Sequence, residues 1–262
     1  MALHAILLPR LDVCRDFGTR WINPEPLDKG GQAQTFLVSH AEEPKGPRRV
    51  AKLLSNPREE RKLRFLEEIE VTETFDHPNV VRSLGRGETT KSKWPYFVMP
   101  YYELGTLEKN HEHLGSPLHL LRIFLAICKG VGYAHSKALI HRDLKSANIF
   151  MAQPVLPVVG DFGLCYRADE DQDGRNTQTS EAVGARKYMP PEWREGRHDR
   201  PGATGDIYSL GKILYWMFKG TSMTDMRTTT QVSIRLLGQE QSSFAKRGPR
   251  KRGRWLTRSR RN

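Results

Sequence analysis

The chain has 262 residues, of which 37% are hydrophobic and 27% are charged, and its formal net charge is +12. This length and composition exclude a chain too short or too polar to bury a core, and they are typical of a soluble globular protein with one large domain or two lobes. Nine Lys and Arg residues and no acidic residue lie in 246–262, which leaves 33 basic and 30 acidic residues elsewhere, so the high charge belongs to this basic tail.

The beginning of the chain and the cysteines bear on localisation. MALHAILLPRLD contains a short apolar run without a preceding basic segment or a small-residue cleavage site, so we expect no signal peptide. The apolar run in 207–218 contains Lys212 and is too short to span a bilayer. Cys14, Cys128 and Cys165 lack metal-ligand spacing and fit reduced thiols. We expect a cytoplasmic protein with no membrane segment; a weak membrane association is the alternative.

Residues up to about 100 are predicted to form a small, mainly β lobe with one long helix. Residues 1–26 are a turn-rich lead-in with little signal. LDKGGQAQTFLVSH places a glycine pair before a strand-like run, and VAKLL is a short apolar strand that contains a lysine. The helix begins near Asn56 as the cap, with Pro57 at the first helical position and Glu59 completing a capping-box-like pattern. NVVRSLGRGE and PYFVMPYY predict two further strands.

The second half is predicted to be mainly helical. SPLHLLRIFLAICKGVGYAH begins with Ser116 as the cap and Pro117 at the first helical position, and it is apolar on nearly all sides, which predicts a buried helix. GDIYSLGKILYWMFKG predicts a second helix that ends at Gly220. A strand hairpin is expected around PVLPVV, and the polar run 168–181 should be mobile. Residues 221–262 lack a sustained helical period.

The stretch HRDLKSANIF, residues 141–150, gathers ionisable and amide side chains before an apolar pair. Phosphoryl transfer requires such a set, because it depends on positioning and charge neutralisation more than on covalent chemistry. It needs backbone amides and a lysine at the phosphates, carboxylate or amide oxygens for magnesium, and a carboxylate for the hydroxyl proton. The chain supplies a candidate for each of these groups in order.

Residues 27–220 resemble the eukaryotic-type (Hanks-type) Ser/Thr protein kinase family through an ordered series of motifs: GGQA, VAK, EEIE, HPNVV, HRDLKSAN, DFG, PPE and DIYSLG. The resemblance implies an α+β, bilobal fold with a small β-rich N-lobe and a mainly helical C-lobe that lacks its last helices. The implied segments are a lead-in at 1–26, an N-lobe at 27–99, a hinge at 100–102, a C-lobe at 103–220 and a divergent, disordered basic tail at 221–262.

The resemblance also implies which residues bind ATP. Lys52 of VAK matches the strand lysine that binds the α- and β-phosphates. Glu68 matches its ion-pair partner, with Glu67 and Glu70 as alternatives. Met99 matches the residue that gates the adenine pocket and precedes the hinge. The residues that the resemblance places around ATP are Gly30, Gly31, Gln32, Ala33, Lys52, Glu68, Met99, Tyr101 and Tyr102.

Catalytic and metal-binding roles follow from the same resemblance. Asp143 matches the catalytic base, and Asn148 and Asp161 match the magnesium ligands. Lys145 matches the residue that approaches the γ-phosphate in Ser/Thr-directed members, which favours Ser/Thr over Tyr acceptors. His141 is expected to be a packed core histidine instead of a proton carrier.

A regulatory role is a hypothesis for the segment after DFG. The resemblance implies that Arg142 pairs with a phosphorylated loop residue, for which Thr177, Thr179 and Ser180 are candidates. Glu181 lies near the position of that phosphosite, and we hypothesise that it partly substitutes for the phosphate. The plainer alternative is a solvated loop glutamate.

The sequence departs from the family pattern at several positions. Asp28 and Ala33 replace the first and third glycines of the phosphate loop, Ala185 replaces a threonine, and Thr72 occupies an apolar position of the helix. After residue 220 the expected helices are absent, which would expose Ile213, Leu214 and Trp216. The tail at 221–262 is therefore native, truncated or frame-altered, and we hypothesise one of the latter two.

The predicted function is ATP- and Mg²⁺-dependent phosphoryl transfer to Ser/Thr hydroxyls of protein substrates. The alternative is a catalytically impaired kinase fold that acts as a nucleotide- or protein-binding module. The basic tail would bind nucleic acid only non-specifically, and a solvated tail or an altered frame is the preferred interpretation. The sequence does not define an oligomeric state.

Overall fold

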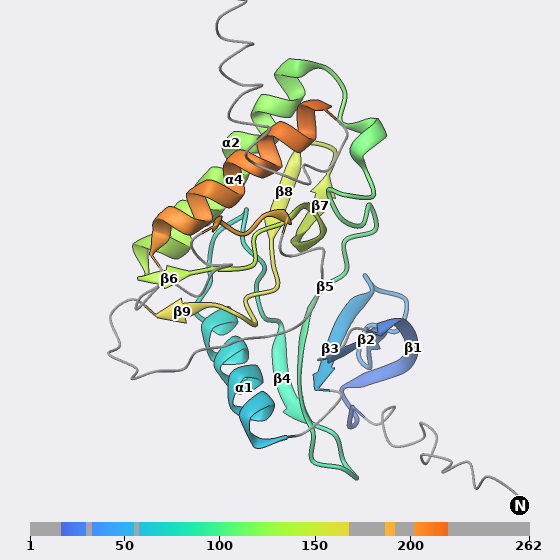
Figure 1. The fold of residues 1–262 in the computed structure, drawn as a ribbon. Helices are drawn as coiled ribbons and strands as arrows, with labels where there is room; N and C mark the ends of the chain where they lie inside the picture. Colours follow the sequence, from blue (N-terminus) through green and yellow to red (C-terminus); the bar gives the residue numbers. More distant parts are fainter. Residues whose placement is uncertain (1–16, 30–32, 55–57, 168–186, 192–201, 220–262) are drawn as a thin grey trace, which may run out of the picture. The chain divides into compact units, whose positions relative to one another are not determined.

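The computed structural model describes residues 17–29, 33–54, 58–167, 187–191 and 202–219. The N-lobe contains an antiparallel sheet with the strand order β1-β2-β3-β5-β4 and one helix, α1 (Figure 1). Its elements are β1 (Trp21–Lys29), β2 (Ala33–His40), β3 (Arg49–Leu54), α1 (Glu59–Glu73), β4 (Gly85–Glu88) and β5 (Pro95–Pro100). As far as the N-lobe is described, this arrangement confirms the predicted β-rich lobe with a single helix.

Strand β1 begins at Trp21, six residues before the start of the kinase-like domain that the sequence analysis gives at residue 27. Pro24 and Pro26 make this stretch look like a turn, but β1 is the edge strand of the sheet. Proline is tolerated at an edge because the missing N–H does not interrupt a ladder on both sides. The pairing register with β2 shifts twice along β1, between Ile22 and Glu25 and between Pro26 and Asp28.

Helix α1 begins later than predicted. Arg58 precedes it in an extended conformation and gives no side-chain cap, so Glu59 opens the helix and does not close a capping box. Asn56 and Pro57 lie outside the described residues. The buried face of α1 consists of Phe65, Glu68, Ile69, Val71 and Thr72. A carboxylate on the buried face of this helix is the first structural sign of a functional site.

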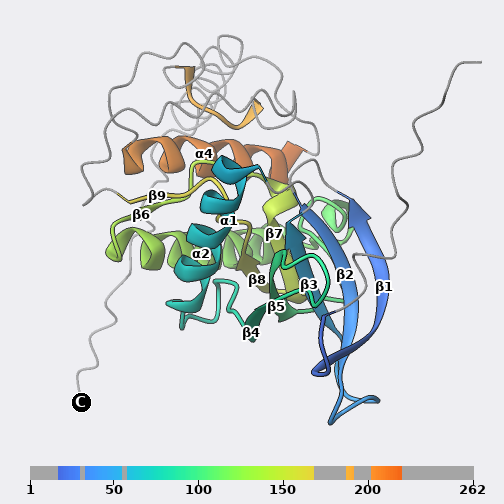
Figure 2. The same cartoon turned by 90° about the horizontal axis from the view of Figure 1, so that it is seen from below.

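Within the described residues, the C-lobe contains two α-helices, α2 and α4, and two small antiparallel strand pairs (Figure 2). Strands β7 and β8 form the hairpin predicted around PVLPVV, and β6 pairs with β9. The elements are η2 (His111–His113), α2 (Pro117–Ser136), β6 (Leu139–Ile140), η3 (Ser146–Asn148), β7 (Ile149–Gln153), β8 (Leu156–Val159), β9 (Tyr166–Arg167) and α4 (Ala203–Lys219). The predicted α+β, bilobal fold is confirmed.

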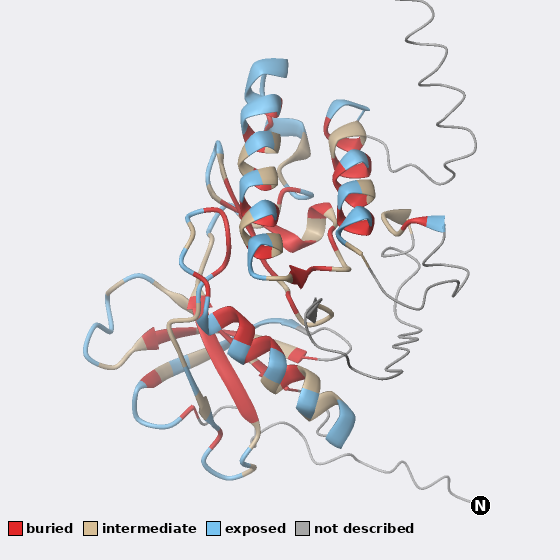
Figure 3. Cartoon of the chain, turned by 90° about the vertical axis from the view of Figure 1, so that its left-hand side faces the viewer, coloured by how far each residue is buried: buried red, intermediate tan, exposed pale blue. Residues whose placement is uncertain are grey.

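Helix α2 is buried on one face only, contrary to the prediction of a helix buried on nearly all sides. It packs against α4 and β8 through residues such as Ile123 and Ile127, whereas Leu118, Leu121 and Leu125 are exposed. Figure 3 shows buried and exposed residues alternating along the helices. By length and composition α2 is apolar enough to cross a membrane, but a core helix of a soluble protein passes the same test.

Helix α4 also differs from expectation. Ile213 and Trp216 are buried and Leu214 is half-buried. The lack of predicted helices after residue 220 had led us to expect all three to be exposed. His111 helps to cover Trp216, since the two rings pack edge to face with centroids 4.6 Å apart. Phe218 is exposed at the end of the helix. Ile213 and Trp216 belong to the larger hydrophobic cluster, so α4 is more buried than the sequence pattern indicates.

Two hydrophobic clusters hold the described residues together. The larger one joins the inner face of the N-lobe sheet and α1 to the C-lobe helices. The smaller one covers the other face of the sheet and is centred on Phe17, which packs edge to face against Phe36 and Tyr96 at centroid distances of 5.4 and 5.0 Å. The Tyr96 hydroxyl donates to the Phe17 carbonyl at 2.9 Å. Strand β3 is thus packed on both faces and fixed in position.

Candidate active site

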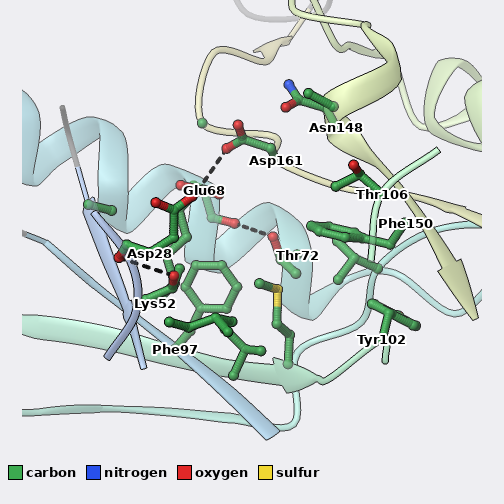
Figure 4. Close-up of a pocket in the computed structure, with 18 of the residues that line it drawn as sticks. Asp28, Lys52, Glu68, Thr72, Phe97, Tyr102, Thr106, Asn148, Phe150 and Asp161 are labelled. Carbon is green, nitrogen blue, oxygen red and sulfur yellow. Dashed lines mark hydrogen bonds and ion pairs between the residues drawn. The ribbon is translucent and has the colours of Figure 1, made fainter. Parts of the chain in front are cut away.

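One lysine connects the two lobes. Lys52 on β3 donates to Glu68 Oε1 of α1 at 2.5 Å and to Asp161 Oδ1 of the C-lobe at 2.8 Å. Figure 4 shows Lys52, Glu68 and Asp161 grouped along one side of a pocket. Among the candidate helix carboxylates, Glu68 is the buried one beside the lysine, and Glu67 and Glu70 are exposed. The structure therefore brings Lys52 and Asp161 to one site, as a shared phosphate site requires.

Electrostatics keep this lysine charged. Burial alone would lower the pKa of Lys52, but Asp161 and Glu68 offset this effect and raise it. Lys52 in turn lowers the pKa of Asp161 to about 2. Burial raises the pKa of Glu68 although Lys52 opposes the rise. The ammonium group is therefore shared between two carboxylates, of which Asp161 is the more strongly ionised.

The carboxylate of Asp143 is held by side chains of its own loop. Lys145 Nζ donates to Asp143 Oδ2 at 2.6 Å, and Asn148 Nδ2 donates to the same oxygen at 2.9 Å. Asn148 Nδ2 also donates to the backbone carbonyl of Asp143 at 2.9 Å. The turn η3 folds the loop back on itself, so the three side chains converge within six residues of sequence.

A buried aspartate on α4 anchors the start of this loop. Asp206 is fully buried and accepts hydrogen bonds from the backbone N–H groups of His141 and Arg142 at 2.8 and 3.0 Å. It also bonds His135 Nε2 at 2.7 Å. His141 is buried, and its Nε2 lies 3.0 Å from the carbonyl of Gly160. The expectation of a packed core histidine at 141 is confirmed.

Two residues of the site adopt left-handed backbone conformations. Arg142 has φ 67° and Asp161 has φ 63°. Such conformations cost roughly 1–3 kcal/mol each and persist only where the surroundings impose them. Here Asp206 binds the amide of Arg142, and Lys52 binds the carboxylate of Asp161. Two of the five positive-φ residues other than glycine among the described residues therefore lie at this site.

A cavity of about 800 Å³ lies between the N-lobe sheet, α1 and the loops of the C-lobe (Figure 4). The predicted site residues that line it are Ala33, Lys52, Glu68, Met99, Tyr101, Tyr102, Asp143, Lys145, Asn148 and Asp161. Gly30, Gly31 and Gln32 lie outside the described residues, as do Thr177, Thr179, Ser180 and Glu181. The regulatory hypothesis for that segment stays a prediction.

The departures at Asp28 and Thr72 also face the cavity. Thr72 is 1% exposed, and its hydroxyl donates to the backbone carbonyl of Glu68 at 2.6 Å. This bond satisfies the hydroxyl within the helix, so a polar residue is tolerated at an apolar position. Asp28 adds a negative charge to the wall of the cavity opposite the C-lobe.

Phe150 and Thr106 line the cavity but were not predicted as site residues. Phe150 stacks on Tyr102 with a centroid distance of 5.4 Å and an interplanar angle of 17°. Its ring also lies against Gly160, where a Cβ atom would come within 2.6 Å of it. The only signal in the sequence was the apolar pair after Asn148, which we interpreted as the start of a strand.

The site is that of a protein-kinase-like fold. A lysine of one lobe pairs with a carboxylate of the other, and the neighbouring loop carries Asp143, Lys145 and Asn148. The model of the protein kinase domain family matches residues 24–255. The chain belongs to this family. The lysine, glutamate and aspartate of the cavity thus occupy the positions that the motif order predicts.

The relatives include bacterial serine/threonine-protein kinases. PknB of Mycobacterium tuberculosis strain H37Rv is 33% identical over 162 residues, which cover 60% of this chain and 25% of PknB. PknD of Protochlamydia amoebophila is 33% identical over 224 residues, which cover 72% of this chain and 22% of PknD. The tyrosine-protein kinase receptor svh-2 of Caenorhabditis elegans is 31% identical over 157 residues, which cover 59% of this chain and 14% of svh-2. The chain spans about a quarter of the length of PknB or PknD.

Proposed function

We propose that this chain transfers the γ-phosphoryl group of ATP to serine or threonine hydroxyls of protein substrates. The observation that carries the proposal is the convergence of Lys52, Asp161 and Asp143 on one cavity. The names of PknB and PknD support a Ser/Thr kinase. The position of Lys145, two residues after Asp143 and bonded to it, supports the same acceptor class. We further propose a cytoplasmic location, which the composition supports.

The residues that line the cavity suit a nucleoside triphosphate. Its hinge end offers the backbone of Tyr101 and Tyr102 beside the apolar side chains of Val50 and Phe150, which suit a flat base. Its other end offers the ammonium group of Lys52, which would neutralise phosphate charge. The two ends are lined by one continuous set of residues, so a base and its phosphates would be bound together.

The donor set also fits Mg²⁺, which prefers one or two carboxylate or amide oxygens together with substrate phosphates. Asp161 uses Oδ1 for Lys52, and Asn148 uses Nδ2 for Asp143, so each has an oxygen left to offer. Asp161 and Asn148 would hold the ion. When bound, it would neutralise charge on the phosphate oxygens.

In the proposed reaction Asp143 would act on the acceptor hydroxyl. The hydrogen bonds from Lys145 and Asn148 both reach Oδ2, so Oδ1 is the oxygen that would accept the proton of the incoming hydroxyl. The same two bonds fix the orientation of the carboxylate before the acceptor binds. Lys145 would then release its hydrogen bond to Asp143 Oδ2 and stabilise charge on the transferred phosphoryl group.

A catalytically impaired nucleotide- or protein-binding module is the second candidate. Asp28 favours it, because a carboxylate in the cavity wall opposes phosphate binding. The retention of all four polar groups, Lys52, Asp143, Asn148 and Asp161, at one cavity opposes it, since binding alone needs no base. Phosphoryl transfer is therefore the better account of the geometry.

Transfer of labelled γ-phosphate to a generic protein substrate, followed by phosphoamino-acid analysis, tests the proposal. We expect phosphoserine and phosphothreonine from the wild-type chain. We expect at least a 100-fold slower reaction from Asp143→Asn, in the range of losses typical for a general base, with nucleotide binding retained. Equal rates for the two proteins, or labelled phosphotyrosine alone, would refute it. Binding of ATP without transfer would favour the second candidate.

A further inference from the structure

Two hydrogen bonds through Tyr188, one to its hydroxyl and one to its backbone carbonyl, link the end of the catalytic loop to α4. Ser146 is fully buried, and its Oγ lies 3.0 Å from the Tyr188 hydroxyl. The backbone carbonyl of Tyr188 lies 2.9 Å from Ser209 Oγ of α4 and is the nearer of the two acceptors of that hydroxyl, the other being the carbonyl of Gly205 at 3.1 Å. Ser146 also points toward Glu108 Oε1 at 3.5 Å. These contacts lie next to the active site but none of these residues lines the cavity.

The geometry gives the catalytic loop two anchors on one rigid element. Asp206 binds the amides of residues 141 and 142 at the start of the loop. Ser209, three residues later on α4, holds Tyr188, which holds Ser146 near the end of the loop. Residues three apart lie on the same face of a helix. Asp143 lies between the two anchors, so their spacing on α4 limits its movement.

We propose that the Ser146–Tyr188 hydrogen bond, supported by Ser209, is a clamp that positions Asp143 and Lys145 for phosphoryl transfer. The inference rests on the proposed function for its kinetic consequence. Both partners have the burial that such a clamp needs: Ser146 is fully enclosed and Tyr188 is half-buried and packed against the main core. The Tyr188 hydroxyl is protonated at neutral pH and can donate, as for any tyrosine, and burial raises its pKa further.

The test compares Ser146→Ala, Tyr188→Phe and the double variant in the phosphoryl-transfer assay. Loss of one hydrogen bond worth roughly 0.5–1.5 kcal/mol should lower kcat about two- to tenfold. KM for ATP should not change, because neither side chain lines the cavity. The double variant should be no slower than the slower single variant, since both substitutions remove the same bond. Ser146→Thr, which keeps a hydroxyl, should restore most of the rate.

Tyr133→Phe is the matched control. Tyr133 is also a half-buried C-lobe tyrosine, and its hydroxyl accepts from the amide of Asp76 at 3.0 Å. Its hydroxyl and ring contact residues 74–77, which lie outside the catalytic loop. This variant should keep the wild-type kcat. Unchanged kcat in both Ser146→Ala and Tyr188→Phe, or losses that add in the double variant, would overturn the clamp.

Amide hydrogen exchange separates failure of the clamp from failure of the proposed function. If the wild-type chain transfers no phosphate, the proposed function fails, but exchange still reports the clamp. Amides of residues 143–148 should exchange faster in Tyr188→Phe than in wild type or Tyr133→Phe. Equal exchange in all three proteins would overturn the inference irrespective of activity.

Discussion

Replacement of Lys52 by methionine tests the electrostatic centre of the site. The substitution keeps the length of the side chain but leaves Glu68, which is 4% exposed, without its cation. Removal of one partner from a buried pair costs roughly 3–5 kcal/mol. The Asp161 side chain is 42% exposed, so solvent screens its interaction with Lys52. We therefore expect the free energy of unfolding to fall by about 3 kcal/mol at pH 7, the lower end of this range.

The loss in the free energy of unfolding caused by Lys52→Met should increase as pH rises. Burial already raises the pKa of Glu68 in the wild type, and in Lys52→Met it should rise further above the unfolded value of about 4.3, because Lys52 no longer opposes the rise. The unfolded chain then releases its proton first, so the free energy of unfolding of the variant falls as pH rises above about 4. In the wild type, the pKa of Asp161 is lowered to about 2, so its contribution is present above pH 4 and is lost as pH falls toward 2. The difference between the two proteins should therefore be larger at pH 7 than at pH 4.

Urea denaturation at pH 4 and pH 7 measures this difference. The control is the double variant Lys52→Met/Glu68→Met, which replaces the pair with apolar side chains and should recover most of the lost stability. A difference that is the same at both pH values would refute the reasoning, as would a double variant that is as unstable as Lys52→Met. Either result would mean that Glu68 is not held as a buried carboxylate by Lys52.

Three further predictions concern the framework of the site. Phe17→Ala should lower the free energy of unfolding by about 3–5 kcal/mol, measured by urea denaturation, because a fully buried ring is removed from the smaller cluster; a loss below 1 kcal/mol would contradict that packing. Gly160→Ala should weaken binding of a fluorescent ATP analogue, because its Cβ would displace the ring of Phe150, and Phe150→Leu should restore binding in the double variant. Asp206→Ala should lower the free energy of unfolding by about 2 kcal/mol or more, since a buried and a partly buried amide of the catalytic loop lose their acceptor; calorimetry checks this, and an unchanged melting temperature would count against it.

Local motifs were sufficient to predict much of the site. Asp143, Lys145 and Asn148 lie within six residues, so one turn of chain places their side chains together and their spacing carries the information. Lys52 is 109 residues from Asp161, and its pairing was predicted only through the resemblance to a family with the same motif order. The bilobal fold followed from the same order of motifs.

Other features could not be predicted because they depend on packing. The two prolines of β1 look like a turn unless the strand is known to lie at the edge of the sheet. Phe17 carries no periodic signal, yet it covers one face of that sheet. Thr72 looks like a defect in an apolar face until its hydrogen bond within the helix is seen.

The sequence by itself determined the class of protein and the chemical groups of its site, because short-range spacing and motif order survive without knowledge of the fold. Only the tertiary structure decided that Glu68 and not a neighbouring carboxylate meets Lys52, that Phe150 lines the cavity, and that Ser146 reaches Tyr188. These contacts join segments from different elements. Their geometry depends on how helices and strands pack in three dimensions, and no local pattern in the chain encodes it.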